Sequence, residues 1–482
     1  MTISKTANLV LIPAPGMGHL APAIELAKHL VARDPRLSIT VLLIKGFVPE
    51  ETVESYILSL KSNSSLLNQG IGFIDIPQID LNSARPSFLT HMNAYQPKVK
   101  EAIEGLRSAG PLPVAGLLVD MFCTSTIDVA TELGLPSYVF FTSGAGLLRL
   151  FFHLHGLGVD VAQEYDVVRS PDTLLEIPGF RNPVPVKVLP GRFLSKDGQS
   201  STFLRLADKF RQAKGILVNT CMEIDRDLIQ SMSQQDIEIP PIYPVGPILN
   251  LPTEDDHGHD DDESSGKDPI TRWLDDQPPR SVVFLCFGSR GTFNDTQIKE
   301  IAVGLERSGQ RFLWSLRQRP GETGVPLELD DPSKVLPEGF FERTAEKGRV
   351  IGWAPQARVL AHKAVGAFVS HCGWNSTLES FWYGVPIAAW PIYAEQQLNA
   401  FVLVKELGLA TEIRIDYCQD FGINMVVKAE EVEDGINKAM KETEVKKKVK
   451  EMCDKARKAL EEGGSSYESI GRFIEVVFKN LP

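Results

Sequence analysis

A histidine and an aspartate in the first half of the chain have the residue types and positions of a proton-transfer pair. His19 follows a Pro/Gly turn after an apolar run, where a strand is expected to give way to a helix. The positive end of a helix lowers the pKa of a nearby imidazole, so we expect a neutral His19 that can accept a proton. Asp120 ends another apolar run and could hold the second ring nitrogen of His19. A histidine that only hydrogen-bonds at a helix start and an aspartate that only caps a helix are the structural alternatives.

A second group of polar residues stands between positions 365 and 379. An apolar strand expected over residues 365–370 runs into a short segment with Gly373, and a helix is expected over residues 375–383. The N–H groups at such a helix start bind phosphate. Further side-chain donors stand in the same segment: His371, Asn375 and Ser376. Glu379, one turn further on, can accept from a ribose hydroxyl, so these residues suit a nucleoside diphosphate.

Two flanking features extend this site. Trp353 follows a strand expected over residues 350–352, and its ring could stack on a base, an interaction worth about 1 to 3 kcal/mol. Glu395 and Gln396 form an acid–amide pair that can bond adjacent hydroxyls of a sugar. Taken singly, a core tryptophan and a surface acid–amide pair are the commoner explanations. Beside the phosphate segment they indicate a sugar-nucleotide site.

Alternating strand and helix patterns position these residues. The first half has expected strands at 8–12, 38–44, 71–76, 114–119, 137–141 and 215–219, with a first helix over 20–32. The same alternation begins again in the second half, with an expected strand at 282–287, a helix at 295–307 and a strand at 312–316. This alternation predicts an α/β protein with two doubly wound parallel sheets, whose ligands bind at the carboxyl ends of the strands.

Composition narrows the class of protein. The chain has 482 residues, enough for two or three compact units, and a formal charge of -12, which disfavours nucleic acid as a partner. Six cysteines without a C-x-x-C pair fit thiols in a reducing compartment. The most apolar window, residues 139–161, is interrupted by Arg149 and two histidines, so no membrane span is expected. Residues 1–15 lack the features of a signal peptide, and we expect a cytoplasmic location.

The stretch 254–268 holds eight acidic residues against one lysine and is expected to be a linker. His257 and His259 lie among its aspartates, and Asp260 to Asp262 matches the D-x-D pattern of metal-dependent sugar transferases. A flexible acidic run fixes no coordination geometry, so no metal site is expected.

A nicotinamide-dependent oxidoreductase is an alternative from another enzyme class. Gly16, Gly18 and Ala21 match the G-x-G-x-x-A fingerprint of dinucleotide-binding domains. That fingerprint needs an acidic residue after the second strand, whereas residues 38–44 are followed by Lys45 and Gly46. A third hypothesis is a protein that binds sugar nucleotides without catalysis.

The 44-residue segment from Trp353 to Gln396 closely resembles the signature box of plant family-1 UDP-sugar glycosyltransferases, which glycosylate secondary metabolites. The resemblance spans essentially the whole chain, and other matching segments are P-G-M-G-H-L at 15–20, the Asp120 position, Asn219-Thr220, P-V-G-P at 244–247 and F-G-S at 287–289. It implies the GT-B architecture of two facing Rossmann-like domains. Residues 1–252 would bind the acceptor and residues 269–464 the UDP-sugar, with a linker at 253–268. A carboxyl-terminal helix within 465–482, expected over Ser466–Phe478, would pack back on the first domain.

The same resemblance implies roles for the donor-site residues. Trp353 would stack on uracil, Ala354 and Gln356 would bond to the base or ribose, and Glu379 would hold the ribose hydroxyls. The diphosphate would be held by Ser289, His371, Asn375 and Ser376, with Gly373 letting the backbone approach. The transferred sugar would be contacted by Trp374, Glu395, Gln396 and Thr142. In this family a Gln at the end of the box implies UDP-glucose as the donor.

The resemblance also implies an inverting mechanism without a metal or a permanently bound cofactor. His19, oriented by Asp120, would remove a proton from an acceptor hydroxyl that attacks the anomeric carbon as UDP departs. The acceptor pocket is expected to contain Phe88, Phe122, Phe141, Leu148, Leu189 and Tyr393. Such a pocket suits a phenolic acceptor such as a flavonoid, dihydrochalcone or coumarin, and a terpenoid alcohol or a hormone is the alternative. We expect a monomer.

Overall fold

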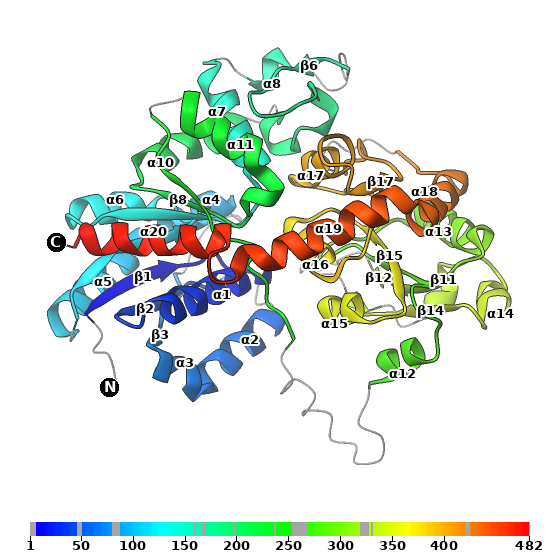
Figure 1. Ribbon diagram of the computed structural model, residues 1–482, viewed down its shortest axis with the longest axis horizontal. Coiled ribbons are helices and arrows are strands. Elements are labelled where there is room, and N and C mark those ends of the chain that lie inside the picture. Colours follow the sequence, from blue (N-terminus) through cyan, green and yellow to red (C-terminus); the bar gives the residue numbers. More distant parts are fainter. Residues whose placement is uncertain are drawn as a thin grey trace. The chain divides into compact units, whose positions relative to one another are not determined.

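The computed structural model describes residues 6–45, 51–79, 87–110, 112–158, 161–165, 170, 172–195, 199–235, 238–252, 268–318, 327–328, 331–419 and 425–481. The chain forms two compact units, each built on a parallel sheet with helices around it (Figure 1). The first unit combines Met1–Val159, Ser201–Asn250 and Lys458–Pro482, and the second combines Asp160–Ser200 and Leu251–Arg457.

These boundaries differ from the expected ones because residues 160–200 group with the second unit. Glu406 accepts hydrogen bonds from the backbone N–H groups of Arg181, at 2.7 Å, and Asn182, at 3.0 Å. The ring of Phe180 lies 6.5 Å from that of Phe401. A segment that interrupts the first unit in sequence therefore packs on helices of the second unit that come more than 200 residues later.

The first unit contains a seven-stranded parallel sheet in the order β3-β2-β1-β4-β5-β8-β9. Its strands are β1 Ala7–Ile12, β2 Leu37–Leu43, β3 Ile71–Asp75, β4 Val114–Asp120, β5 Ser137–Phe141, β8 Ile216–Val218 and β9 Ile242–Pro244. Continuous apolar runs become central strands because helices bury both faces of a parallel sheet. The order reverses between β1 and β4, the type of position at which such sheets bind ligands.

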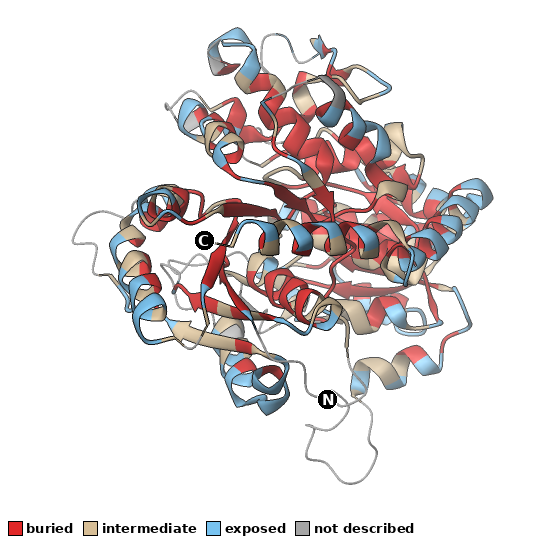
Figure 2. Ribbon diagram, turned by 60° about the vertical axis from the view of Figure 1, so that its left-hand side comes forward, coloured by how far each residue is buried: buried red, intermediate tan, exposed pale blue. Residues whose placement is uncertain are grey.

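The helices of the first unit are α1 Met17–Arg33, α2 Glu51–Ser62, α3 Ser64–Gln69, α4 Phe88–Ala94, α5 Gln96–Ala109, α6 Thr126–Glu132, α7 Ala145–Gly156, α10 Leu206–Gln212, α11 Met222–Gln235 and α20 Ser465–Lys479, while α9 Gln199–Leu204 begins at the unit boundary. Figure 2 shows most strand residues buried and the outer helix faces exposed. The carboxyl-terminal helix α20, red in Figure 1, packs on β9, β4 and α1. Its Phe473 meets the rings of Tyr138 at 5.1 Å and Tyr243 at 5.7 Å.

The second unit contains a six-stranded parallel sheet in the order β14-β11-β10-β15-β16-β17. Its strands are β10 Val282–Cys286, β11 Arg311–Ser315, β14 Gly348–Ile351, β15 Val365–Ser370, β16 Ile387–Ala389 and β17 Ala410–Glu412. Its helices are α8 Val161–Glu164, α12 Pro269–Asp275, α13 Asp295–Ser308, α14 Phe340–Thr344, α15 Gln356–Ala361, α16 Trp374–Tyr383, α17 Gln396–Phe401, α18 Ala429–Lys441 and most of α19 Thr443–Leu460. Short two-stranded pieces pair β6 Leu174–Leu175 with β7 Val184–Pro185, and β12 Arg317–Gln318 with β13 Leu327–Glu328.

The predicted fold class is confirmed: both halves are parallel α/β units. The strands predicted at 137–141 and 365–370 are observed with those bounds. Most of the predicted acidic linker, with His257 and His259, lies in residues 253–267, outside the described residues. Among the described residues, no helix has the length and apolarity needed to cross a membrane.

Candidate active site

The first-unit site forms at the carboxyl ends of β1 and β4. His19 lies in the first turn of α1, and Asp120 is the last residue of β4. His19 Nδ1 is 2.9 Å from Asp120 Oδ2. The other carboxylate oxygen, Oδ1, accepts the backbone N–H of Phe122 at 2.9 Å. The Asp120 side chain is 1% exposed and that of His19 26%, so the buried carboxylate holds a ring that is open to a ligand.

The polarity of this contact determines which nitrogen of His19 can act as a base. An ionised carboxylate only accepts hydrogen bonds, so it favours the tautomer with the hydrogen on Nδ1. In the neutral imidazole the other nitrogen, Nε2, then carries the lone pair. The arrangement suits removal of a proton from a bound hydroxyl, with Asp120 stabilising the resulting imidazolium.

Thr142 also contacts His19. It follows β5, the strand beside β4, and its Oγ1 lies 2.9 Å from His19 Nδ1. The Thr142 residue is 6% exposed. The resemblance implies a sugar contact for Thr142, whereas in this structure its hydroxyl is hydrogen-bonded to the candidate base.

Aromatic rings lie beside the histidine. The ring of Phe122 is 5.2 Å from that of His19 and inclined by 53°, and Phe88 meets Phe122 edge-on at 5.6 Å. The ring of Phe203 lies 6.2 Å from that of Phe122 and was not predicted from the sequence. These rings form an apolar wall next to the base.

The other residues predicted for the acceptor pocket stay predictions. Phe141 and Leu148 have no exposed surface, and Phe141 packs in the core against Phe151 and Phe210. Leu189 and Tyr393 belong to the second unit. Within the first unit, Phe122 and Phe88 are the predicted pocket residues whose rings form the cluster next to His19.

In the second unit, the loop after β15 holds His371 in place. Cys372 has a left-handed backbone conformation with φ 60°. Its N–H donates to Ser370 Oγ at 3.1 Å, and its carbonyl accepts from Asn399 Nδ2 at 3.0 Å. A Cβ added to Gly288 or to Gly373 would lie 2.6 or 2.5 Å from His371 Nε2. The ring thus fits between two glycines that leave room for it.

Burial keeps His371 uncharged. Desolvation lowers its pKa to about 4, although a hydrogen bond to the Cys286 backbone acts in the opposite direction. Its Nδ1 is buried and has no hydrogen-bond partner among the described residues. His371 is therefore a neutral side chain near the start of α16, and the favourable electrostatics for an anion come from that helix start.

That helix start is suited to an anion. α16 has ten residues, and its N-cap, Gly373, offers no side-chain cap to the first N–H groups. Ser376 and Trp374 are buried near this end. The carbonyl of Ser289, on the loop after β10, accepts from Arg317 Nη1 at 2.7 Å, which fixes that loop. The start of α16 therefore offers uncapped N–H groups, and the diphosphate contacts implied for this segment stay predictions.

A glutamate and a glutamine form the next part of the site. Gln356 Nε2 donates to Glu379 Oε2 at 2.7 Å and to Ser376 Oγ at 2.8 Å. Burial raises the pKa of Glu379 to about 7, with the Gln356 hydrogen bond opposing the shift. Trp353 is 58% exposed, whereas its neighbour Ala354 is buried. An exposed indole close in sequence to an amide that bonds a carboxyl, both of them half-buried, is a suitable arrangement for a nucleoside.

Gln396 is already partly engaged in its own loop. It is 4% exposed, and its Oε1 accepts the backbone N–H groups of Ile392 at 2.9 Å and Tyr393 at 3.1 Å. The amide Nε2 is the part that remains to donate to a sugar hydroxyl. Glu395 precedes it as the N-cap of α17.

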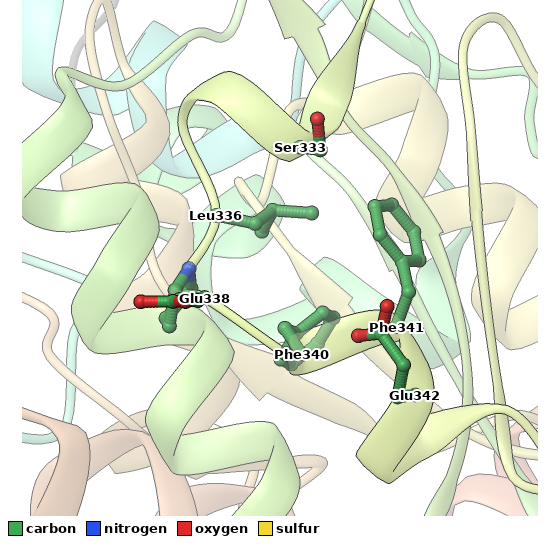
Figure 3. Close-up of a pocket in the computed structure, with 8 residues that line it drawn as sticks. Ser333, Leu336, Glu338, Phe340, Phe341 and Glu342 are labelled. Atoms are coloured by element: carbon green, nitrogen blue, oxygen red, sulfur yellow. The ribbon is translucent and has the colours of Figure 1, made fainter.

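The second unit also holds a cavity of about 290 Å³ beside α14. Figure 3 shows Ser333, Leu336 and Phe340 among the residues that line it. None of the predicted site residues lines this cavity, so it is separate from the candidate site. Among the parts of the chain that the structure describes, no group of three or more His, Cys, Asp or Glu residues could hold a metal ion.

The fold and the site together define a class of protein. Two parallel α/β units, with a His–Asp pair at the strand ends of one and an uncapped helix start after a strand of the other, fit a nucleotide-sugar transferase of the GT-B fold.

Comparisons with known proteins identify the family. Residues 203–430 match the model described as UDP-glucoronosyl and UDP-glucosyl transferase. UDP-glucose flavonoid 3-O-glucosyltransferase 6 of Fragaria ananassa is 49% identical, over 98% of this chain and 99% of its own length. The solved structure of a UGT transferase from Siraitia grosvenorii in complex with UDP has a TM-score of 0.87 at 46% identity, covering 98% of this chain and 100% of that one. Medicago truncatula UGT71G1, complexed with UDP-glucose, has a TM-score of 0.85 at 43% identity, covering 98% of both chains.

This chain therefore belongs to the plant family-1 UDP-glycosyltransferases and is a glycosyltransferase enzyme. The predicted family, fold class and enzyme class are confirmed. The family transfers sugars, so membership removes the support for the oxidoreductase alternative.

Proposed function

We propose that this enzyme transfers glucose from UDP-glucose to a hydroxyl of a small phenolic metabolite and gives a β-glucoside. The observation that carries the proposal is the contact of 2.9 Å between His19 Nδ1 and the buried Asp120 carboxylate. It leaves Nε2 of a partly exposed imidazole as a proton acceptor. A sugar-nucleotide-binding protein without catalysis has no need for such a pair.

In the proposed reaction, His19 Nε2 takes the proton of the acceptor hydroxyl as its oxygen bonds to the anomeric carbon of glucose. The bond from that carbon to the UDP oxygen breaks, and UDP leaves from the opposite face, so the configuration inverts from α to β. A positioned base contributes typically about 10²- to 10⁴-fold to such a step. Asp120 stabilises the imidazolium, and the start of α16 stabilises the charge on the departing diphosphate.

For the donor, we propose that Trp353 stacks on uracil, that Gln356 and Glu379 bind the ribose side, and that Gln396 donates its Nε2–H to the hexose. Support comes from the 2.7 Å Gln356–Glu379 contact and from the bound UDP-glucose named for the Medicago truncatula structure. His371 and Ser376 would meet the diphosphate. The remaining sequence-implied contacts, including those of Ala354, Trp374, Asn375 and Glu395, stay predictions.

For the acceptor, a flat aromatic phenol is the proposed class. The rings of Phe122 and Phe88 beside His19 offer a surface on which an aromatic acceptor can stack. The name of the Fragaria ananassa relative, a flavonoid 3-O-glucosyltransferase, supports the same class. A cytoplasmic location, a monomeric state and independence from metal ions stay predictions beside it.

The test is incubation with UDP-glucose and a panel of flavonols, dihydrochalcones, coumarins and terpenoid alcohols, with chelator present, read by mass spectrometry. We expect a hexose on at least one phenolic and, by NMR, a β-anomeric linkage. Transfer only to terpenoid alcohols would mean that the acceptor is a terpenoid and not a phenol. An α-linked product would refute the inverting mechanism. Loss of transfer in the presence of chelator would show that the reaction requires a metal ion.

A further inference from the structure

We propose that Thr142 is a positioning residue for the base, holding the His19 ring together with Asp120. The proposal rests on the proposed function of His19. The resemblance assigns Thr142 to the transferred sugar, and it gives this residue no part in the proton transfer.

The sheet brings Thr142 to His19. β4 and β5 are parallel neighbours in which Asp120 pairs with Phe140, so Thr142 lies just beyond Asp120 at the carboxyl edge of the sheet. Asp120 Oδ2 and Thr142 Oγ1 both lie 2.9 Å from the same atom, His19 Nδ1. Asp120 and Thr142 are both nearly inaccessible to solvent. Two buried oxygens from adjacent strands therefore converge on one ring nitrogen.

The chemistry of these groups determines the direction of both hydrogen bonds. An unprotonated Nδ1 would direct its lone pair at the Asp120 carboxylate, which is repulsive in a buried site. Nδ1 therefore carries the hydrogen, and Thr142 Oγ1 accepts it in a three-centre bond shared with Asp120. The Thr142 hydroxyl hydrogen is not used in this contact and can still be donated to a ligand, so the positioning role and a sugar contact are compatible.

Two acceptors on Nδ1–H have consequences for catalysis. They restrict rotation of the ring, and the ring of Phe122, 5.2 Å away, lies beside it. Hydrogen bonds to a charged donor are stronger than those to a neutral one, so both acceptors favour the imidazolium over the neutral ring. Thr142 is thus expected to raise the pKa of His19 and its strength as a base.

Asp120 is the charged group that contacts the His19 ring from β4, and Phe122 and Thr142 are uncharged. Behind Asp120, burial and the carboxylate charge raise the pKa of the Cys123 thiol well above its usual value, so Cys123 stays neutral. Removing the Thr142 hydroxyl therefore leaves the charges around His19 unchanged.

The experiment compares Thr142→Val, which removes the hydroxyl at nearly constant shape, with Thr142→Ser, which keeps it. NMR of protein labelled with ¹⁵N-histidine reads the pKa and tautomer of His19 without any substrate, and His19→Gln assigns the signal. We expect the pKa of His19 to fall by about 0.5 to 1 unit in Thr142→Val, the equivalent of one hydrogen bond. In Thr142→Ser the pKa of His19 should stay near its wild-type value. Thr142→Ala replaces Thr142→Val if the valine variant does not fold.

In activity assays, the acidic limb of the pH profile of kcat/KM should move to lower pH in Thr142→Val, by the same number of pH units as the pKa of His19. An unchanged His19 pKa, or a raised KM for UDP-glucose with no movement of the limb, would overturn the positioning role and leave the sugar contact. The NMR result stands whether or not the wild type transfers glucose. Failure of the proposed function is seen separately, as absence of transfer by the wild type.

Discussion

Single residues of this enzyme do different chemistry because their surroundings differ. His19 is a quarter exposed and touches a buried carboxylate, which suits a residue that must gain and lose a proton. His371 is buried, and its pKa is lowered to about 4, so it stays neutral over the physiological range. The proposed roles of these two histidines, a base for His19 and an uncharged polar group for His371, follow from this difference in burial.

Replacing the base should separate catalysis from donor binding. We expect His19→Ala to lower kcat by about 10²- to 10⁴-fold because the acceptor hydroxyl loses its proton acceptor. UDP-glucose should bind with unchanged affinity by calorimetry, since the proposed donor residues lie almost entirely in the second unit. Asp120→Asn should also lower kcat, because the amide cannot stabilise the imidazolium charge. Loss of UDP-glucose binding in His19→Ala would contradict the assignment.

Glu379 should make donor binding depend on pH. Its folded-state pKa is raised to about 7, so the carboxyl is protonated below that pH and ionised above it. Only the ionised form accepts hydrogen bonds from both ribose hydroxyls, so the affinity for UDP-glucose should increase by up to about tenfold as pH rises from about 6 to about 8.

The matched variant is Glu379→Gln, which keeps the shape of the side chain and removes the titration. Its affinity for UDP-glucose, measured by calorimetry over the same range, should be nearly constant. The raised pKa also means that stability is lost as pH rises through about 7, so the variant should melt at a higher temperature than the wild type at alkaline pH. Parallel affinity profiles for the two proteins would refute the role of Glu379.

At the scale of elements, the site is made by loops that follow parallel strands. The loop after β15 combines a left-handed Cys372 with hydrogen bonds to Ser370 and Asn399, and it leads directly into α16. Neither a strand nor a helix pattern predicts such a loop. Its close fit around His371 makes it sensitive to very small substitutions.

Gly373→Ala should weaken UDP binding although its backbone conformation, φ -60°, is open to any residue. The added Cβ would lie 2.5 Å from His371 Nε2, so the ring must move away from its position. We expect the Kd for UDP, measured by calorimetry, to rise about tenfold, the equivalent of one hydrogen bond. Gly105→Ala is the control, because no atom lies within 4 Å of its added Cβ. Equal Kd values for the two variants would exclude a role for the His371 position.

At the scale of the whole molecule, the first unit is completed by the end of the chain. α20 follows the second unit in sequence but packs on the first, where Phe473 is fully buried and Ser466 Oγ donates to the Gly246 carbonyl at 2.5 Å. Arg33 lies 4.0 Å above the ring of Tyr467. The core of the first unit is therefore complete only with α20 in place.

Phe473→Ala should destabilise the first unit by about 3 to 5 kcal/mol, because it removes a buried ring and leaves a cavity between Tyr138 and Tyr243. Scanning calorimetry should show the unfolding transition of that unit at a lower temperature. Phe341→Ala is the comparison, since Phe341 is 40% exposed in the second unit and should change stability by less than about 0.5 kcal/mol. Similar decreases in unfolding temperature for the two variants would show that α20 contributes little to the core of the first unit.

Much of this architecture is readable before any coordinates are known. Long apolar runs become buried parallel strands because both faces of such a sheet are covered, which is why residues 137–141 and 365–370 were predictable to the residue. Phe203 was missed because an isolated aromatic residue in a short helix carries no periodic signal. The assignment of residues 160–200 to the second unit depends on contacts such as Arg181 with Glu406, which no local pattern records.

The amino-acid sequence by itself determined the α/β fold, the family and the positions of His19, Asp120 and the segment from Trp353 to Gln396, because hydrophobic periodicity and motif spacing are local properties of the chain. The tertiary structure alone decided that Thr142 meets His19, that Phe141 belongs to the core and that His371 is neutral while Glu379 titrates near pH 7. Such properties depend on distances between residues far apart in sequence and on how completely water is excluded, and folding sets both.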